Sequence, residues 1–189
     1  MSFVKIAIIG ASGTGKTTLA RALSEEFSLP LIREQARLVM AEFGMELKEI
    51  RKHPKLLLRF QDRVLEMQIK SELEHPDGFV SDRSVFDNLT LFLRHCTFTE
   101  AELFAYQQKV MYHYRRHPYD LLLFLRPGEF PLVADGVRTP DPNYQWQVDG
   151  MILSLLKLLF VEYFEPYGSI EQRTEQVKNI LREKKLLEG

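Results

Sequence analysis

One glycine-rich stretch near the start of the chain, GASGTGKT at residues 10–17, constrains the fold more than any other. It matches the phosphate-loop pattern G-x-x-x-x-G-K-[ST] at every fixed position. A short apolar run at residues 3–9 precedes it and is typical of a buried strand. Leu19, Leu23 and Phe27 follow at helical spacing. A strand, a glycine loop and a helix in this order predict a nucleoside triphosphate site rather than a plain turn.

The residue types of this loop are those that phosphate binding requires. Glycines adopt backbone angles closed to other residues, so successive N–H groups converge on an anion at the positive end of the following helix. Lys16 is expected to reach the β- and γ-phosphates of ATP, and the Thr17 hydroxyl to ligate Mg²⁺. The expected nucleotide contacts are Gly10, Ala11, Ser12, Gly13, Thr14, Gly15, Lys16, Thr17 and Thr18.

Length and composition narrow the class of protein. A chain of 189 residues suits one domain, expected over residues 1–189, with room for a small lid. A net charge of -1 gives no reason to expect nucleic-acid or membrane-surface binding, and no apolar run is long enough to span a bilayer. The single Cys96 fits a reducing compartment, and no secretory segment precedes residue 3, so a cytoplasmic location is expected.

Strand and helix patterns alternate along the chain. Further strands are predicted at 29–34, 79–82, 121–125 and, weakly, 167–171. Helices are predicted at 35–43, 56–73, 84–94, 100–116, 144–164 and 172–186. This alternation predicts an α/β fold, with a parallel sheet and helices on both faces. Residues 127–143 are dense in Pro and Gly and predict an irregular lid segment.

A second acidic position refines the functional prediction. Asp82 ends a predicted strand, so it should lie at the carboxyl edge of the sheet, where it can hold Mg²⁺ together with Thr17. The alternative is that Asp82 caps the helix that begins near Ser84. Arg83 stands where a hydrolytic ATPase of the AAA+ type usually has a glutamate, which disfavours that class.

The phosphate loop, Asp82-Arg83-Ser84 and Asp135-Gly136-Val137-Arg138 resemble the small-molecule kinase branch of the phosphate-loop proteins. More narrowly, the chain resembles the AAA_28-type ATPase/kinase domains, which are akin to the ribosylnicotinamide kinase domain of NAD-biosynthesis regulators. Glu34-Gln35-Ala36-Arg37 is similar to another recurring segment of that group. The resemblance implies a three-layer P-loop NTPase fold, whose five-stranded parallel sheet has the order 2-3-1-4-5.

Candidate catalytic and acceptor residues follow from this resemblance and from position. Glu34, at the end of the second strand, is implied to accept the proton of the attacking hydroxyl; alternatively it caps the next helix. Arg37 and Arg83 are candidate acceptor-binding residues, although Arg37 can instead pair with a carboxylate on its own helix. Arg138 on the lid and Arg126 at its base are candidates to neutralise the transferring phosphoryl group; either could instead be a plain surface charge or a salt bridge.

The predicted function is Mg²⁺- and ATP-dependent phosphoryl transfer to a small nucleoside- or nucleotide-like acceptor. The alternative is an ATPase or nucleotide switch that acts on a protein partner. Gln61 and Gln68 lie seven apart on one predicted helix face, where either could bond a base amide. An exposed polar stripe is the simpler interpretation of this pair.

Overall fold

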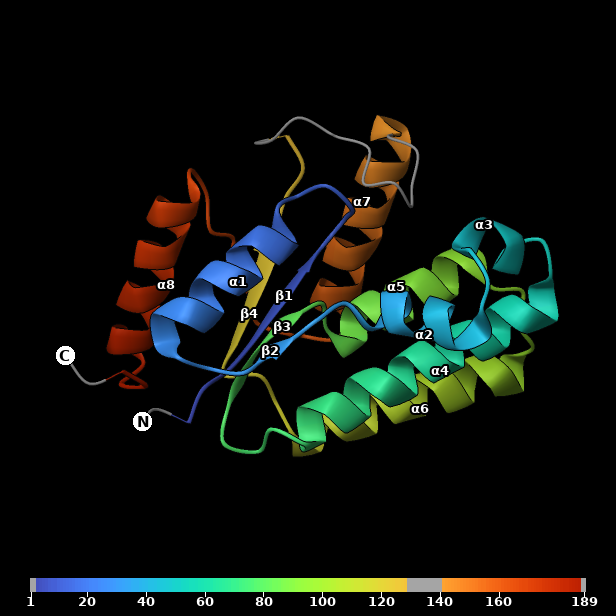
Figure 1. The fold of residues 1–189 in the computed structure, drawn as a ribbon, viewed down its shortest axis with the longest axis horizontal. Coiled ribbons are helices and arrows are strands. Elements are labelled where there is room, and N and C mark those ends of the chain that lie inside the picture. The colour runs from blue at the N-terminus through green and yellow to red at the C-terminus, as the bar shows by residue number, and fades with distance from the viewer. Residues whose placement is uncertain (1–2, 129–140, 188–189) are drawn as a thin grey trace.

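A computed structural model describes residues 3–128 and 141–187. Four strands are present in the described residues: β1 (Lys5–Gly10), β2 (Leu31–Ile32), β3 (Phe79–Asp82) and β4 (Leu121–Leu125). They pair in parallel in the order β2-β3-β1-β4 (Figure 1). β1 therefore occupies the interior of the sheet, and its carboxyl end delivers the glycine-rich loop beside the end of β3.

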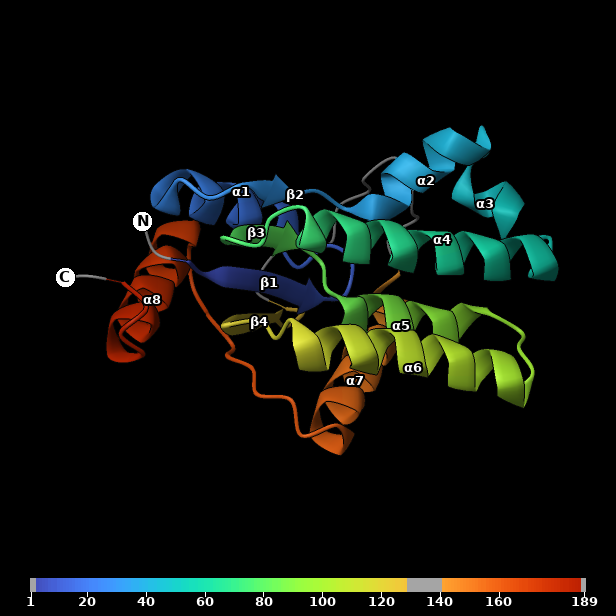
Figure 2. The same cartoon turned by 90° about the horizontal axis from the view of Figure 1, so that it is seen from below.

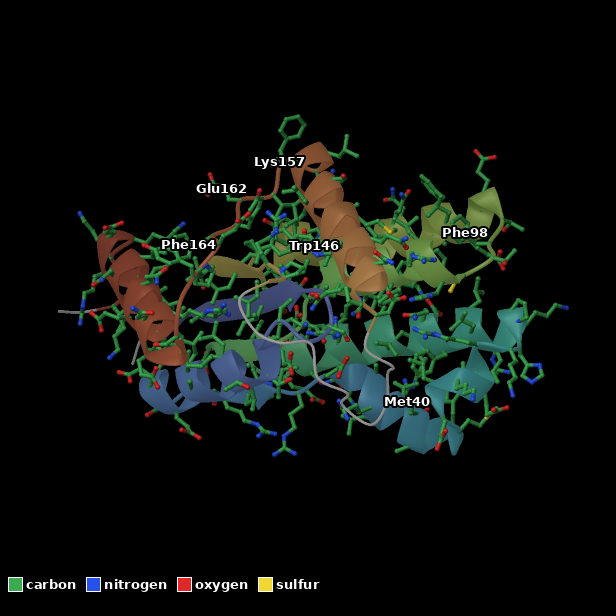
Figure 3. The ribbon with its side chains drawn as sticks, turned by 90° about the horizontal axis from the view of Figure 1, so that it is seen from above. Met40, Phe98, Trp146, Lys157, Glu162 and Phe164 are labelled. Atoms are coloured by element: carbon green, nitrogen blue, oxygen red, sulfur yellow. The ribbon has the colours of Figure 1, made fainter. Side chains whose placement is uncertain are left out.

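The predicted five-stranded order is wrong in its last strand. In place of a fifth strand, one residue of the segment between α7 and α8, Phe164 (Figure 3), forms an isolated parallel bridge to Leu123 on the free side of β4. The Phe164 N–H donates to the Leu122 carbonyl at 2.9 Å. Alternate residues of a parallel strand face the same neighbour, so Pro166 would be the next donor, and it has no N–H. Pairing stops there. The residues predicted as the last strand, 167–171, instead run into α8, which begins at Ile170.

Helices cover both faces of the sheet, as predicted (Figure 2). On one face lie α1 (Lys16–Phe27) and α8 (Ile170–Glu183), whose apolar side chains pack against Ile6, Ile8 and Leu123. On the other face lie α5 (Val85–His95), α6 (Glu100–Arg116) and α7 (Pro142–Leu158). Because both faces are covered, β4 is apolar at every position, and all five of its residues are buried.

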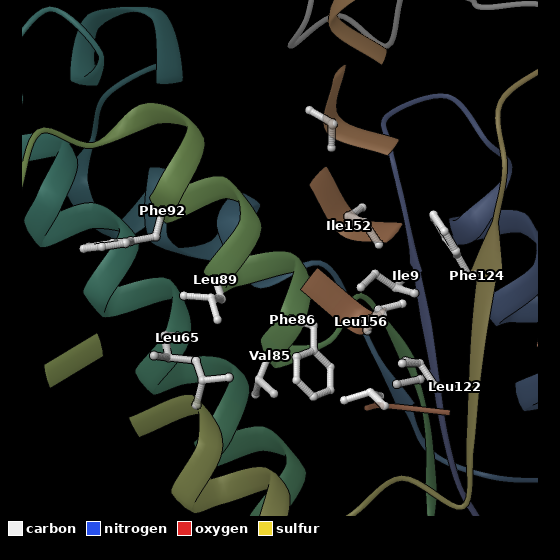
Figure 4. Close-up of a cluster of buried hydrophobic side chains, with 14 of the residues drawn as sticks. Ile9, Leu65, Val85, Phe86, Leu89, Phe92, Leu122, Phe124, Ile152 and Leu156 are labelled. Atoms are coloured by element: carbon white, nitrogen blue, oxygen red, sulfur yellow. The ribbon is translucent and has the colours of Figure 1, made fainter. Parts of the chain in front are cut away.

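The core of the second face centres on α5. Figure 4 shows Phe86 and Leu89 of this helix among side chains from the sheet and from α7, including Ile9 and Ile152. Ser84 caps α5 by accepting bonds from the N–H groups of Phe86 and Asp87. This packing fixes the first turn of α5, which follows directly after β3.

A helical extension lies beyond the sheet. α2 (Gln35–Phe43), α3 (Leu47–Ile50) and α4 (Pro54–Leu73) share a separate apolar cluster around Phe60. α2 ends before Gly44, which has the left-handed φ of 62° expected of a C-cap. α3 was not predicted, and four residues are too few for a periodic pattern to be recognised.

Other predicted boundaries also differ from the structure. The strand predicted at 29–34 is β2, which covers only Leu31–Ile32, and the helix predicted at 172–186 is α8, Ile170–Glu183. The helix predicted at 144–164 is α7, which begins at Pro142 and ends at Leu158. It ends there because Phe160 takes a left-handed φ of 53° and the Val161 N–H donates to the Leu156 carbonyl.

None of the helices in the described ranges is long and apolar enough to cross a membrane.

Candidate active site

The glycine-rich loop joins β1 to α1 in a conformation that its residue types explain. At Gly10, a Cβ atom would lie 2.5 Å from the Leu125 carbonyl oxygen, so only glycine fits between the two strand ends. Gly15, the N-cap of α1, has a left-handed φ of 86°. Thr18 lies exposed in the first turn of the helix. The loop therefore sits at the positive end of α1, as a phosphate site requires.

Lys16 is buried within this loop. Its ammonium group donates to the Ala11 carbonyl and lies 3.5 Å from the Thr14 hydroxyl. Burial, followed by the nearby charge of Arg83, lowers the pKa of Lys16 to about 8. A cation held in so poorly solvated a place is costly without an anion, and nucleotide phosphates would supply that anion.

Thr17 and Asp82 meet where the loop faces the end of β3. The Thr17 hydroxyl donates to Asp82 Oδ2 at 2.6 Å, although 65 residues separate the two in sequence. A hydroxyl and a carboxylate are hard oxygen ligands of the kind that Mg²⁺ takes together with phosphate oxygens and waters. No cluster of three or more His, Cys, Asp or Glu side chains suited to a metal is found in the described ranges.

The cap of α5 is Ser84, not Asp82, so the capping alternative for Asp82 does not describe the fold. Ser84 accepts from the backbone of α5, and Asp87 Oδ2 accepts in return from the Ser84 N–H at 2.9 Å. The Asp82 side chain is left to face Thr17.

Arg83 connects Glu34, at the start of α2, to Asp87, in the first turn of α5. Its Nε donates to Glu34 Oε1 at 2.8 Å, and its Nη1 donates to Asp87 Oδ1 at 3.1 Å. The same Asp87 oxygen accepts the Gly10 N–H at 3.4 Å. Burial opposes the charge of Arg83 most, yet the surrounding carboxylates, Glu34 first, raise its pKa above the ordinary value.

The backbone of Arg83 is strained. Its φ is 103°, a value that side-chain-bearing residues rarely adopt, and its N–H donates to the Ile8 carbonyl of β1. Strain of this kind persists only where the surroundings over-determine it, and it clusters at functional sites. The turn after β3 is thus held so that the guanidinium lies between Glu34 and Asp87.

Glu34 does not cap α2 with its side chain, although it occupies the N-cap position. Its carboxylate contacts Arg83 through one oxygen and the Nε of Arg37, at 3.2 Å, through the other. Arg37 thus pairs with a carboxylate of its own helix start, as one of the two interpretations expected. A groove beside them is lined by Arg21, Arg33, Glu34 and Arg37, and it opens onto Thr17 and Asp82.

A separate pocket opens on the other side of Arg83. Its lining residues come from the phosphate loop and from five helices: Ser12, Ala36, Leu47, Arg51, Phe60, Gln61, Val64, Arg83, Asn88, Leu91, His95, Tyr144 and Val148. The Nδ2 amide of Asn88 is buried and has no hydrogen-bond partner among residues 3–128 and 141–187. An orphaned donor in a pocket wall is a place where a ligand oxygen or ring nitrogen would bind.

Polar side chains surround the mouth of this pocket. The Tyr144 hydroxyl lies 2.8 Å from His95 Nε2, and Arg51 Nη2 lies 3.3 Å from the same nitrogen. Arginine can only donate, so in the contact with Arg51 the acceptor is His95 Nε2. The rings of His95 and Tyr144 stack at 5.7 Å.

The two glutamines of α4 are separated by this geometry. Gln61 lines the pocket, whereas Gln68 donates to Glu72 and Ser81 in a buried polar network away from it. Both side chains are buried, so the expectation of an exposed stripe is wrong. The face they share packs against α5 and α6 instead of facing solvent.

Arg126 lies in a salt bridge. Its Nε and Nη2 contact the two carboxylate oxygens of Asp149 on α7 at 2.9 and 2.8 Å, and Nη1 reaches Glu165. This was the alternative to a phosphate contact. Arg138, with Asp135 and Gly136, lies outside the described residues, and so does most of the predicted lid.

Sequence reasoning missed several residues of the site. Asp87 carried a local signal, because it stands three residues after Ser84, the spacing of a capping box. Asn88, one residue further, carried none, and neither did Gln145 of α7, which donates to the Ser12 carbonyl. Only packing of distant elements brings these side chains to the loop.

Comparison with known proteins places this geometry in context. The family model AAA_28, described as an AAA domain, matches residues 5–173. A search of curated proteins found no match. Among solved structures, the fold is similar to the NadR protein in complex with NR, with a TM-score of 0.73 and 14% identity over 96% of this chain and 50% of NadR. The chain thus spans about half the length of NadR.

Two smaller kinases are similar over nearly their whole length. Deoxyadenosine kinase from M. mycoides with bound dCTP has a TM-score of 0.66 and 16% identity, over 95% of this chain and 100% of the kinase. Shikimate kinase from Acinetobacter baumannii in complex with shikimate has a TM-score of 0.57 and 14% identity, over 98% of this chain and 96% of the enzyme. At these identities, the likeness establishes a P-loop kinase-like α/β fold.

Proposed function

Because this chain belongs to the AAA_28 family of AAA domains, we propose that it transfers the γ-phosphoryl group of ATP, with Mg²⁺, to a small nucleoside- or nucleotide-like acceptor. One observation carries the proposal. A continuous line of polar contacts runs from the Gly10 N–H through Asp87 and Arg83 to Glu34, and a pocket opens beside it. The glycine-rich loop and this pocket thus share one wall, at Ser12 and Arg83.

In this proposal, the chain's own residues divide the reaction between them. Lys16 binds the β- and γ-phosphates, and the loop N–H groups hold the rest of the triphosphate. Glu34 accepts the proton of the acceptor hydroxyl while the new O–P bond forms and the bond to the ADP oxygen breaks. Arg83 holds the Glu34 carboxylate in place. Mg²⁺, held by Thr17 and Asp82, would neutralise charge on the phosphoryl oxygens.

The pocket supports a planar acceptor with a polar edge. Phe60, Val64 and Val148 supply apolar walls, whereas Asn88 presents an amide donor that has no protein partner. Gln61 adds a second side-chain amide to the lining. Apolar walls with a few placed amides suit the edge of a nucleobase or of a carboxamide-bearing ring. The free volume is about 30 Å³, so a whole ring would enter only as the lining side chains move apart.

We extend the proposal to the residues that the sequence singled out around the lid. Arg138 is proposed to neutralise the transferring phosphoryl group. Arg126 could join it only by leaving Asp149. The groove arginine Arg37 is proposed as a contact for an acceptor with an anionic group. Residues 1–189 are proposed to act as one kinase-like domain.

The test is ATP consumption with a panel of nucleosides, nucleotides and vitamin-like alcohols, with and without Mg²⁺. We expect ADP to appear only when one of these acceptors and Mg²⁺ are both present. Glu34→Gln, which keeps the shape of the side chain, should lower kcat about 10²-fold. The exposed Glu42→Gln on α2 is the matched control and should change nothing. Steady ATP turnover without any acceptor would instead favour an ATPase or switch that acts on a protein partner.

A further inference from the structure

Two side chains from the far end of the sequence hold the outer side of the phosphate loop. Gln145 of α7 donates its amide to the Ser12 carbonyl at 2.7 Å. Arg173 of α8 donates through Nη1 to the Thr14 carbonyl at 3.5 Å. The partners lie 133 and 159 residues apart in sequence. Neither side chain belongs to the loop motif, and both helices are packed on the sheet.

These two contacts determine where the next amides point. In a trans peptide, the carbonyl and the following N–H point in opposite directions, and the described chain has no cis peptide. Drawing the Ser12 and Thr14 carbonyls outward therefore turns the N–H groups of Gly13 and Gly15 toward the inner side of the loop. The Ala11 carbonyl, in contrast, bonds within the loop: it accepts from the Thr14 hydroxyl at 3.0 Å.

The burial of both donors argues against an incidental contact. Arg173 is fully buried, and Gln145 is only 6% exposed. A buried guanidinium is expensive to desolvate, and an apolar residue of similar size would pack at lower cost. Arg173 is satisfied partly by backbone carbonyls, Gly168 at 3.0 Å and Thr14. A positive charge is therefore kept directly beneath a loop proposed to bind phosphates.

We propose that Gln145 and Arg173 are positioning residues for nucleotide binding: by holding the carbonyls of Ser12 and Thr14, they aim the amides of Gly13 and Gly15 at the phosphates. The inference rests on the proposed function only in taking the loop's ligand to be a nucleotide. Gln145 also joins this loop to the acceptor pocket, because its helix neighbours Tyr144 and Val148 line that pocket.

The decisive variant is Gln145→Glu, which preserves shape but replaces the donor with a carboxylate against a carbonyl oxygen. Calorimetric binding of ADP and of inorganic tripolyphosphate, without acceptor, should weaken at least tenfold, while the urea midpoint stays close to wild type. Gln147→Glu is the matched control: it lies exposed on the same helix, accepts from Arg94 and should bind both probes normally. If Gln145→Glu does not fold, Gln145→Met removes the donor without charge and should weaken ADP at least threefold.

For Arg173, we expect graded losses. Arg173→Lys keeps the charge and one donor, so its loss of ADP affinity should be smaller than that of Arg173→Met at matched stability. A purely structural role would affect folding without this order. The proposal is overturned if folded Gln145 variants bind ADP and tripolyphosphate within twofold of wild type. Since these measurements need no acceptor, they succeed or fail independently of whether any phosphoryl transfer is found.

Discussion

The phosphate loop and the proposed acceptor pocket lie side by side at the carboxyl ends of the strands, yet they are built in different ways. The loop is one continuous stretch, residues 10–17, and backbone angles and amides do most of its work. The pocket collects single side chains from five helices, among them Gln61 and Asn88, and has no motif of its own. A site made of backbone tolerates little change in sequence, whereas a site made of side chains can change its ligand by one substitution.

The first prediction tests the phosphate loop by removing the charge of Lys16. Lys16→Met should reduce phosphoryl transfer by about 10³-fold or more, because the loop offers no second cation to the β/γ-phosphates. Measured turnover within a few-fold of wild type would remove Lys16 from the mechanism. Lys55→Met, exposed in the first turn of α4, is the control and should keep the phosphate loop working.

The same variant should be more thermally stable than wild type without nucleotide at pH 7. The pKa of Lys16 in the folded protein, about 8, lies below its ordinary value of 10.5. The unfolded chain therefore binds more protons between these values, and wild-type stability rises with pH across that window. Below it, the buried ammonium is a cost that methionine removes. A lower Tm for Lys16→Met would contradict this account.

A second prediction concerns Asp82, which faces Thr17 of the phosphate loop from the end of β3. Asp82→Asn should reduce kcat by about 10²-fold or more and shift the Mg²⁺ requirement upward, because an amide oxygen binds the ion more weakly than a carboxylate. The variant should fold normally, since Asn keeps an acceptor for the Thr17 hydroxyl. A titration of activity against Mg²⁺ checks this; full activity at low Mg²⁺ would exclude Asp82 as the metal ligand.

A third prediction sharpens the pocket side. Asn88→Asp replaces the unpartnered amide donor with an acceptor, so the KM of the physiological acceptor should rise about 10–100-fold while ATP binding stays unchanged. Acceptors that donate from the same edge should gain in relative kcat/KM. Asn143→Asp, exposed at the start of α7, is the control. Equal losses for all acceptors and for ATP would mean that Asn88 supports the fold alone.

The last prediction is a pH dependence confined to the loop, and its effect is smallest near neutral pH. Because Lys16 must be protonated to bind phosphate, ADP affinity should be flat below pH 8 and fall about tenfold per pH unit above it. Calorimetry with metal-free ADP from pH 7 to 10 measures this, and Lys16→Met should abolish the slope. Binding of an uncharged acceptor should not follow it. A parallel fall for both ligands would point to unfolding.

The predicted helix and strand boundaries were right where a local sequence signal marks them. The predicted boundaries 35–43 and 100–116 agree with α2 and α6, because Gly44 marks where α2 ends and the capping box of Thr99 and Glu102 marks where α6 begins. The last strand failed for an equally local reason, since Pro166 cannot continue a ladder that Phe164 begins. There, the weak pattern at 167–171 was over-interpreted.

The sequence by itself determined the α/β class, the phosphate loop and the placement of Asp82 at a strand end. These depend on glycine geometry, apolar periodicity and the rule that parallel strands share one carboxyl edge. Glu34 was predicted to end a strand, but β2 ends at Ile32 and Glu34 is the N-cap residue of α2. Tertiary structure alone decided which partners these side chains take: Arg83 between Glu34 and Asp87, Arg126 on Asp149, and Gln145 and Arg173 on the loop carbonyls. The physical reason is that a hydrogen bond between residues far apart in sequence leaves no periodic trace, because its geometry exists only once the helices have packed on the sheet.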